Sequence, residues 1–147
     1  MAEASVLKLL AEDAEGLAII AAAVQDGLAK PDGIKFNKQA RTFGLEINRF
    51  QWETAGKRPP YFRSRSILAF SGVLSARQQK ITRGIDDVFG LLDVGFKPAA
   101  EPPGGTITLT FANGAQVQLD VECIDVTLMD TGKAWPTRRK PDHGKPS

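Results

Sequence analysis

The alternation of apolar and polar residues predicts one helix near the start of the chain, followed by a series of strands. Between Asp13 and Ala29, apolar side chains recur at steps of three and four, which is the spacing of one face of an α-helix. Asp13 is a good N-cap residue, and Pro31 stops the helix because it cannot continue the backbone hydrogen bonding. The side chains expected to pack on a sheet are Leu17, Ile20, Val24 and Leu28.

From Ile34 onward the apolar residues alternate with a period of two, which predicts strands. Ile34 and Phe36 have even numbers, whereas the next apolar residues, Phe43 and Leu45, have odd numbers. Because residues directly opposite in an antiparallel pair share a face, we expect Phe36 opposite Phe43. Ile34 then lies opposite Leu45, and the four residues 38–41 form a hairpin loop built on a type I turn.

A second hairpin is predicted around the Asn-Gly pair at residues 113–114. A two-residue turn would place Leu109 opposite a glutamine and mix the apolar and polar faces. A three-residue loop over 112–114 places Leu109 opposite Val117 and keeps both on one face. Gly114 should then have a positive φ, a conformation that glycine adopts without strain.

Further strands are predicted at residues 5–11, 61–76 and 88–98. The alternation changes phase after Ile47 and again after Cys123. Such a slip indicates a bulge, a bend or a switch between two buried faces, as a strongly curved sheet requires. We therefore expect an α+β fold: a mainly antiparallel, strongly curved sheet or partial barrel of about six to seven strands, with one N-terminal helix packed on it.

Length and composition are typical of one soluble domain in the cytoplasm. The 147 residues are 42% hydrophobic and 24% charged, with no apolar run long enough to span a membrane and no basic start typical of a signal peptide. Cys123 is the only cysteine, so no internal disulfide can form. We expect a globular domain over residues 1–132 and a flexible, basic, proline-rich tail over residues 133–147.

The net charge of +2 conceals an uneven distribution. Residues 49–83 carry eight Lys and Arg against one acid, whereas residues 84–132 carry eight acids against one Lys. The simpler interpretation is that these two segments face each other and pair their charges across neighbouring strands. The alternative is that the basic segment forms a surface patch for phosphate or nucleic acid.

The alternative has specific candidate residues. In the stretch YFRSRS, Tyr61, Arg63 and Arg65 would share one strand face, an arrangement that suits single-stranded nucleic acid. Outward-facing arginines paired with acids on a neighbouring strand would give the same pattern. The candidates for anion or nucleic-acid contact are Tyr61, Arg63, Arg65, Arg77, Lys80, Arg83, Arg138, Arg139 and Lys140.

Residue types for catalysis or metal binding are sparse. The only histidine, His143, lies in the predicted tail, so we expect no Cys-His or Ser-His-Asp arrangement. There is no Cys and His cluster for zinc and no glycine-rich phosphate loop, so we predict no cofactor, metal or catalytic residue. Carboxylates could act as an acid and base, but surface acids are the simpler interpretation. They include Asp86, Asp87, Glu122, Asp125 and Asp130.

Several stretches of the chain resemble a family of uncharacterised bacterial proteins, the domain of unknown function 2948. They are LKLLAEDAEGLAIIAAAVQD, LEINRFQWE, PPGGTITLTFANGAQVQLDVECIDVTLMDTGKAW and RRKPDH, and the most specific parts are NRFQWE and LDVECID. The resemblance covers most of the chain. It implies a small cytoplasmic protein with no assigned activity, cofactor or catalytic residues.

Three functional hypotheses follow from the sequence. The first is a non-enzymatic cytoplasmic binding or adaptor module that recognises a protein partner, for example at a sheet edge. The second is a nucleic-acid or phosphate-binding module that uses residues 49–83 and the tail. The third and least supported is an enzyme that depends on carboxylates alone. We expect no membrane association, and the sequence predicts no particular oligomeric state.

Overall fold

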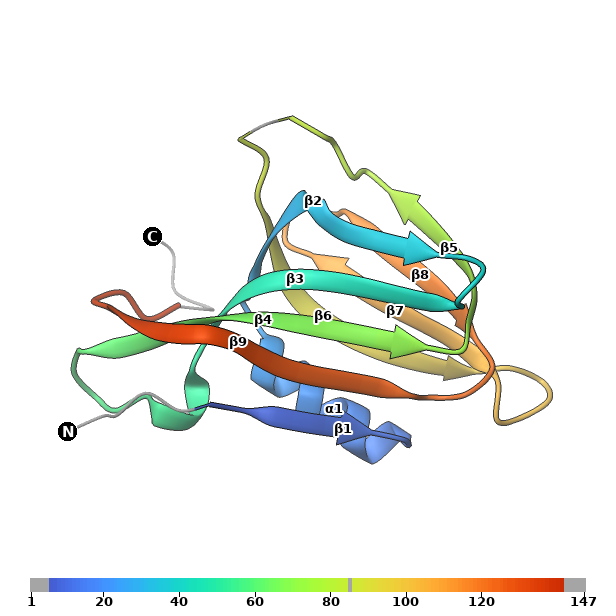
Figure 1. The fold of residues 1–147 in the computed structure, drawn as a ribbon, viewed down its shortest axis with the longest axis horizontal. Helices are drawn as coiled ribbons and strands as arrows, with labels where there is room; N and C mark the ends of the chain where they lie inside the picture. The colour runs from blue at the N-terminus through green and yellow to red at the C-terminus, as the bar shows by residue number, and fades with distance from the viewer. Residues whose placement is uncertain (1–5, 85, 142–147) are drawn as a thin grey trace.

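The computed structural model describes residues 6–84 and 86–141, in which one helix packs against a nine-stranded sheet (Figure 1). All the strand pairs are antiparallel, which confirms the α+β class and the mainly antiparallel sheet. In order across the sheet, the strands are β1 (Lys8–Ala11), β9 (Val126–Thr137), β4 (Tyr61–Ser71), β3 (Thr42–Phe50), β2 (Leu28–Asn37), β6 (Phe89–Pro98), β7 (Gly105–Phe111), β8 (Gln116–Val121) and β5 (Val73–Gln79).

The helix α1 (Ala14–Val24) begins where the sequence predicts. The side chain of Asp13 accepts a hydrogen bond from the N–H of Gly16 at 2.7 Å, as expected of an N-cap residue. Burial of the apolar stripe on the sheet is confirmed for three of its four residues. These are Leu17, Ile20 and Val24.

The prediction that the helix continues to Ala29 is wrong. Asp26 has a φ of +66°, which takes the backbone out of the helical conformation. The N–H of Asp26 donates to the carbonyl of Leu91 at 2.7 Å, and the N–H of Leu91 donates to the carbonyl of Gly27 at 2.8 Å. The chain therefore pairs with β6 and continues as β2. Leu28 is consequently a strand residue, 40% exposed, and not part of the helix stripe.

Both predicted hairpins are confirmed. In the first, Phe36 pairs with Phe43 across a four-residue loop. In the second, Leu109 pairs with Val117, and Gly114 has a φ of +83°. The registers follow from the requirement that apolar side chains share one face, which a slip of one residue would violate.

The number of strands exceeds the prediction because two predicted strands are each divided. The predicted strand over 61–76 is interrupted at Gly72, whose φ is +69°. The predicted strand that follows the Asn-Gly hairpin is interrupted between Val121 and Val126. The two interruptions meet at one corner of the sheet, where the N–H of Glu122 donates to the carbonyl of Gly72 at 2.9 Å. Beyond this corner, the paired strands β4 and β9 continue as the paired strands β5 and β8.

The prediction of strong curvature or a partial barrel is also wrong, because the nine-stranded sheet is neither closed nor strongly curled. The strands change direction at the Gly72 corner by ending and restarting, so they do not bend continuously. Buried side chains from α1 and from both parts of the sheet, β1–β4 with β9 and β5–β8, form one core cluster. No helix within residues 6–84 and 86–141 is long and apolar enough to cross a membrane.

The strand β9 runs past residue 132, the predicted end of the domain. Trp135 of β9 pairs with Arg63 of β4. Residues 133–137 therefore belong to the sheet, and the prediction of a flexible tail is wrong for them. Residues 138–141 follow the strand without a helix or strand of their own, and 142–147 lie outside the described residues, as does the first residue of the strand predicted at 5–11.

Candidate functional site

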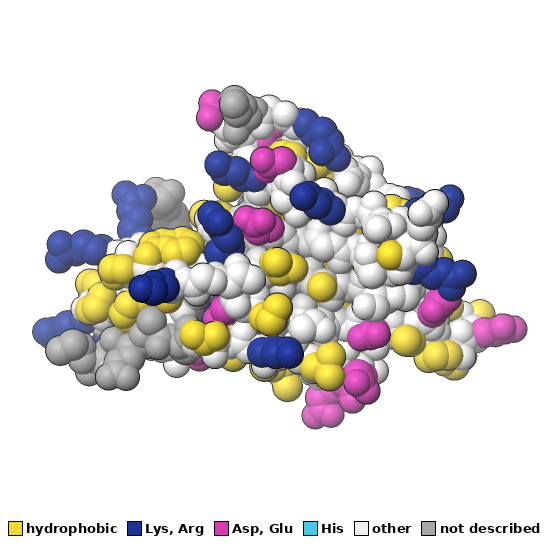
Figure 2. Space-filling view, viewed as in Figure 1, with side chains coloured by type: hydrophobic (Ala, Val, Ile, Leu, Met, Phe, Trp, Pro, Cys, Tyr) yellow, Lys and Arg dark blue, Asp and Glu magenta, His cyan; other side chains and the backbone are white. Residues whose placement is uncertain are grey.

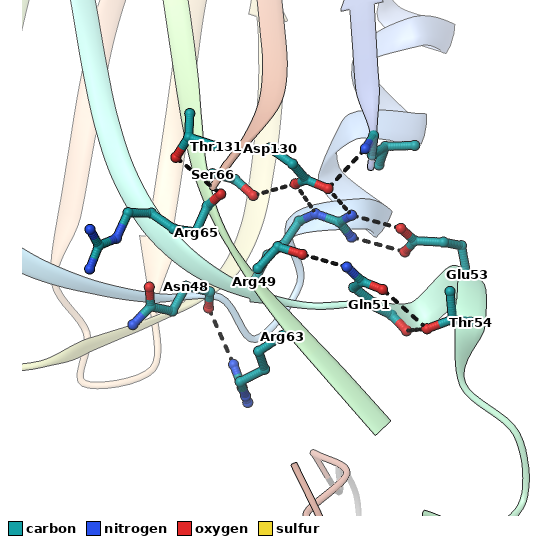
Figure 3. A network of polar contacts seen from close by, with 12 residues as sticks. Asn48, Arg49, Gln51, Glu53, Thr54, Arg63, Arg65, Ser66, Asp130 and Thr131 are labelled. Carbon is teal, nitrogen blue, oxygen red and sulfur yellow. Dashed lines mark hydrogen bonds and ion pairs between the residues drawn. The ribbon is translucent and has the colours of Figure 1, made fainter. Parts of the chain in front are cut away.

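The most densely connected polar cluster lies around Arg49, at the end of β3 (Figure 3). Its guanidinium is fully buried, and both Nε and Nη2 donate to Asp130 at 2.7 Å. Its Nη1 and Nη2 donate to Glu53 at 2.9 and 2.6 Å, and Glu53 lies in the short 3₁₀ helix η1 (Trp52–Thr54). Two bidentate carboxylate contacts therefore hold the guanidinium plane in one orientation.

Asp130 of β9 extends this cluster to two more segments of the chain. It accepts a hydrogen bond from the hydroxyl of Ser66 on β4 at 2.6 Å. It also accepts one from the backbone N–H of Leu7, just before β1, at 2.9 Å. The cluster therefore links β1, β3, β4, β9 and η1 at one end of the sheet.

The charged forms dominate in the cluster. Burial by itself raises the pKa of Asp130, but hydrogen bonds from Arg49 and Ser66 outweigh burial and hold that pKa below its ordinary value. Burial lowers the pKa of Arg49, but hydrogen bonds to Asp130 and Glu53 outweigh burial and raise it. Neither group is poised to exchange a proton near neutral pH, as a general acid or base would be.

The cluster is a structural element that sequence reasoning missed. The side chains of Arg49 and Asp130 are 0% and 2% exposed, so a ligand cannot reach them. The alternation of the strands could have revealed both residues, because each lies two positions after a core-facing residue of its own strand and therefore faces the core as well. The core-facing series are Phe43, Leu45, Ile47 and Arg49 on β3, and Val126, Leu128 and Asp130 on β9.

The two oppositely charged segments of the chain face each other, as the simpler interpretation predicts. Arg49 pairs with Asp130 between β3 and β9, and Arg77 pairs with Asp120 between β5 and β8. In the second pair, Nη1 lies 2.6 Å from Oδ2, and the hydroxyl of Ser75 donates to the same oxygen at 2.6 Å. Hydrogen bonds from Arg77 and Ser75 lower the pKa of Asp120.

The predicted strip of Tyr61, Arg63 and Arg65 is not formed. Tyr61 is 6% exposed, and its ring lies 5.7 Å from that of Phe50 in the protein interior. Arg65 is exposed, with its Nε 3.3 Å from Oε1 of Glu46. The register of β4 against β9 shifts between Arg63 and Arg65, which breaks the alternation that the prediction assumed.

Three other predicted contact residues are scattered over the surface. Lys80 and Arg83 lie in the connection between β5 and β6. Arg138 lines a separate depression beside Pro59 and Pro60. Together with the ion pairs of Arg65 and Arg77, this placement shows that the nine predicted residues do not form one patch.

Arg63, Arg139 and Lys140 do come together. Arg63 projects from β4 and the other two follow β9, and all three line a cavity of about 350 Å³. The Nη1 of Arg63 donates to the carbonyl of Asn48 at 3.2 Å (Figure 3). Its guanidinium carbon lies 5.7 Å from the centre of the Phe50 ring. This cavity is where the structure brings part of the predicted anion-binding set into one place.

Three of the carboxylates identified in the sequence make different local contacts. Asp130 belongs to the buried cluster, and Glu122 forms a surface ion pair. Asp87 accepts a hydrogen bond from the N–H of Gly84 at 2.7 Å. Among residues 6–84 and 86–141, no three or more His, Cys, Asp or Glu side chains are grouped so that they could hold a metal ion. His143 lies outside the described residues.

Exposed apolar side chains stand on the outer face of the sheet near β1. Met129 of β9 pairs with Ile67 of β4 on one side and with Lys8 of β1 on the other, so these side chains share a face. The exposed fractions are 42% for Met129, 40% for Ile67, 61% for Leu10 and 84% for Val6. Figure 2 shows separate hydrophobic side chains on this face, with Lys or Arg and acidic side chains close by. We call Val6, Leu10, Ile67 and Met129 the β1 patch.

Comparison with known proteins places this fold in a family. Residues 7–143 match the family model described as Protein of unknown function (DUF2948). The match includes the helix, the nine strands, the Arg49 cluster and the cavity at Arg63. No curated protein and no solved structure matches the chain. The chain therefore belongs to the DUF2948 family, whose function is unknown.

Proposed function

We propose that the protein is a non-enzymatic binding module that recognises another protein through the β1 patch. The observation that carries the proposal is the exposure of Leu10 at 61%, Met129 at 42% and Ile67 at 40% on three neighbouring strands, with Val6 at 84% just before the first of them. Adjacent exposed apolar side chains are a usual mark of protein interaction sites, because their burial against a partner removes them from water.

The free edge of the sheet supports the same location. The strand β1 pairs with β9 on one side and is the first strand in the sheet order, so it forms one edge of the sheet. Its other side has no neighbouring strand among the described residues and can pair with a strand from another chain. The proposed occupant is therefore an extended segment of another protein, whose backbone pairs with β1 and whose apolar side chains cover Leu10 and Met129.

The residues next to the patch are small, which favours close approach of such a segment. Gly44 of β3 pairs with Ala69 of β4, and Ala69 pairs with Thr127 of β9. This row lies beside Ile67 and Met129 on the same face, and its short side chains project little above the backbone of the sheet. The apolar side chains of a partner strand that pairs with β1 can therefore contact Leu10 and lean towards Met129.

Site-specific photo-crosslinking tests this proposal. A photoreactive amino acid replaces Met129 in one version of the protein and Leu74 in another. Leu74 of β5 is 45% exposed and lies at the opposite end of the sheet order, so it is a matched control. We expect the Met129 position to form a covalent adduct with a different protein, and the Leu74 position to form none.

A second substitution separates specific binding at the β1 patch from non-specific association of other proteins with the surface. Leu10→Lys should abolish the adduct at Met129, because a charge in the patch disfavours apolar contact. Leu74→Lys in the same background should leave the adduct unchanged. Equal adducts from both photoreactive positions would contradict the proposal. Adducts formed exclusively with a second copy of this chain would contradict it as well.

A further inference from the structure

The cavity beside Arg63 collects three cations from two distant parts of the chain. Arg63 comes from β4, whereas Arg139 and Lys140 follow the last strand. Among the described residues of the lining, these three cations stand against one acid, Asp26, and the volume is about 350 Å³. The lining therefore has an excess of positive charge in a space close in size to the smallest ligand pockets, about 300 Å³.

Arg63 differs from the arginines that form ion pairs. Arg49, Arg65 and Arg77 each have a carboxylate oxygen within 3.3 Å. In the part of the chain that the structure describes, Arg63 has no carboxylate at salt-bridge distance, and its contacts are a backbone carbonyl and the Phe50 ring. Burial lowers its pKa and the charge of Asp26 partly offsets this, but the guanidinium stays protonated at neutral pH.

We infer that this cavity binds the phosphate group of a small phosphorylated ligand. A half-buried guanidinium without a carboxylate in direct contact gains most from an anion that accepts two of its N–H groups, as phosphate oxygens do. Arg139 and Lys140 approach the same space and add charge to the site. Gly90, which has no side chain, and Ala112, whose side chain is one methyl group, form part of the wall and leave room for a ligand. This inference is independent of the protein-binding proposal, which concerns a different face.

Titration of the full-length, isotope-labelled protein with inorganic phosphate and with pyrophosphate tests the inference. The amide NMR signals of Gly90 and Ala112 report on the cavity wall. We expect saturable shifts at these two amides, and smaller shifts at amides on β5. Uniform, non-saturating shifts over the whole surface would overturn the inference, because they would indicate general screening of charge.

Charge-removing variants with matched controls locate the site. Arg63→Gln should weaken pyrophosphate binding by about tenfold or more, because it removes charge-assisted hydrogen bonds. Arg65→Gln removes the same charge from the same strand outside this cavity and should change the affinity by less than about twofold. Equal losses in the two variants would overturn the inference.

A second pair of variants avoids any effect of Arg63 on folding. Residues 139 and 140 follow the last strand, so the double substitution Arg139→Gln/Lys140→Gln leaves the sheet intact. It should weaken pyrophosphate binding by about tenfold. The control is Lys133→Gln/Arg138→Gln, which removes two charges near by without touching the cavity lining. Unchanged binding in the first double variant would overturn the inference.

Asp26→Asn provides a test with the opposite sign. Asn tolerates the positive φ of residue 26, and the substitution removes the negative charge from the lining. Phosphate should therefore bind more tightly, an outcome that damage to the fold cannot produce. Weaker binding would contradict the assigned electrostatics.

A single-stranded oligonucleotide distinguishes a small ligand from a nucleic acid. Its binding should be weaker than that of pyrophosphate, and Arg63→Gln and Arg65→Gln should affect it equally. Oligonucleotide binding without any effect of pyrophosphate at Gly90 and Ala112 would overturn the inference.

Discussion

Two ion pairs join the basic and the acidic segments of this chain, and they differ mainly in burial. In the first, Nε of Arg49 lies 2.7 Å from Oδ1 of Asp130; in the second, Nη1 of Arg77 lies 2.6 Å from Oδ2 of Asp120. The side chains of the first pair are 0% and 2% exposed, whereas those of the second are 54% and 35% exposed. Because the distances are nearly equal, contact length does not separate the two pairs.

The difference in burial determines the energetic consequence of each pair. Water and salt screen the exposed pair, which contributes about 0–1 kcal/mol to stability. In the buried pair, desolvation offsets much of the attraction, but removal of one partner leaves an uncompensated charge in the interior. Arg63 is a third case, because it is half-buried and its direct contacts are a backbone carbonyl and an aromatic ring. Its guanidinium therefore has unused capacity to bind an anion from solution.

Asp130→Asn is expected to have the largest effect on stability. The substitution should lower the free energy of unfolding by about 3–5 kcal/mol, because the buried guanidinium of Arg49 loses the carboxylate that is buried with it and keeps only the partly exposed Glu53 as a charge partner. Urea denaturation followed by circular dichroism measures this loss. Asp120→Asn is the matched control and should lower the same quantity by about 1 kcal/mol or less. Comparable losses in both variants would show that burial does not distinguish the pairs.

Acidification is expected to have an intermediate effect. Although burial opposes it, hydrogen bonding from Arg49 and Ser66 keeps the folded-state pKa of Asp130 below the unfolded value of about 3.9. The stabilisation is therefore complete above about pH 5 and is lost as the pH falls through about 4 towards the folded-state pKa. The free energy of unfolding should fall less steeply with acid in Asp130→Asn than in the wild type. Parallel curves would contradict the role of this carboxylate.

Arg77→Gln is expected to have the smallest effect. The free energy of unfolding should fall by about 0–1 kcal/mol, because the pair is exposed to solvent. Added salt at about 1 M should reduce the difference from the wild type, because it screens the charges. Urea denaturation at low and high salt measures both quantities. A salt-independent loss above about 2 kcal/mol would place this pair in the same class as the buried one.

The parts of the fold that the sequence predicts correctly are those in which one local rule dominates. The alternation of apolar residues predicted the register of both hairpins, and the N-cap residue Asp13 predicted the start of the helix. The end of the helix depended on the backbone of Leu91, which is distant in sequence. The division of strands at Gly72 likewise depended on a contact with Glu122. Such long-range backbone pairing leaves no periodic signal in either segment.

The candidate site was predictable only in part, for a related reason. Arg63 and the residues 139–140 were named as anion contacts from local composition, but they share a cavity because β9 pairs beside β4. Arg49 and Asp130 occupy positions of their strands that alternate with the outward-facing residues and so point into the core. In a sequence, a single charged residue at such a position is normally taken to mean that the alternation has shifted by one residue and that the side chain faces solvent. The partner of each charge, which permits burial, lies on another strand.

Double-mutant cycles on the two ion pairs are the most direct test of the central claim. One cycle combines Arg49→Met with Asp130→Asn, and the other combines Arg77→Met with Asp120→Asn. Each yields the coupling free energy between the two side chains from four denaturation curves. The structure predicts a coupling above about 2 kcal/mol for the buried pair and below about 1 kcal/mol for the exposed pair. Equal couplings would contradict the conclusion that burial determines the contribution of each pair.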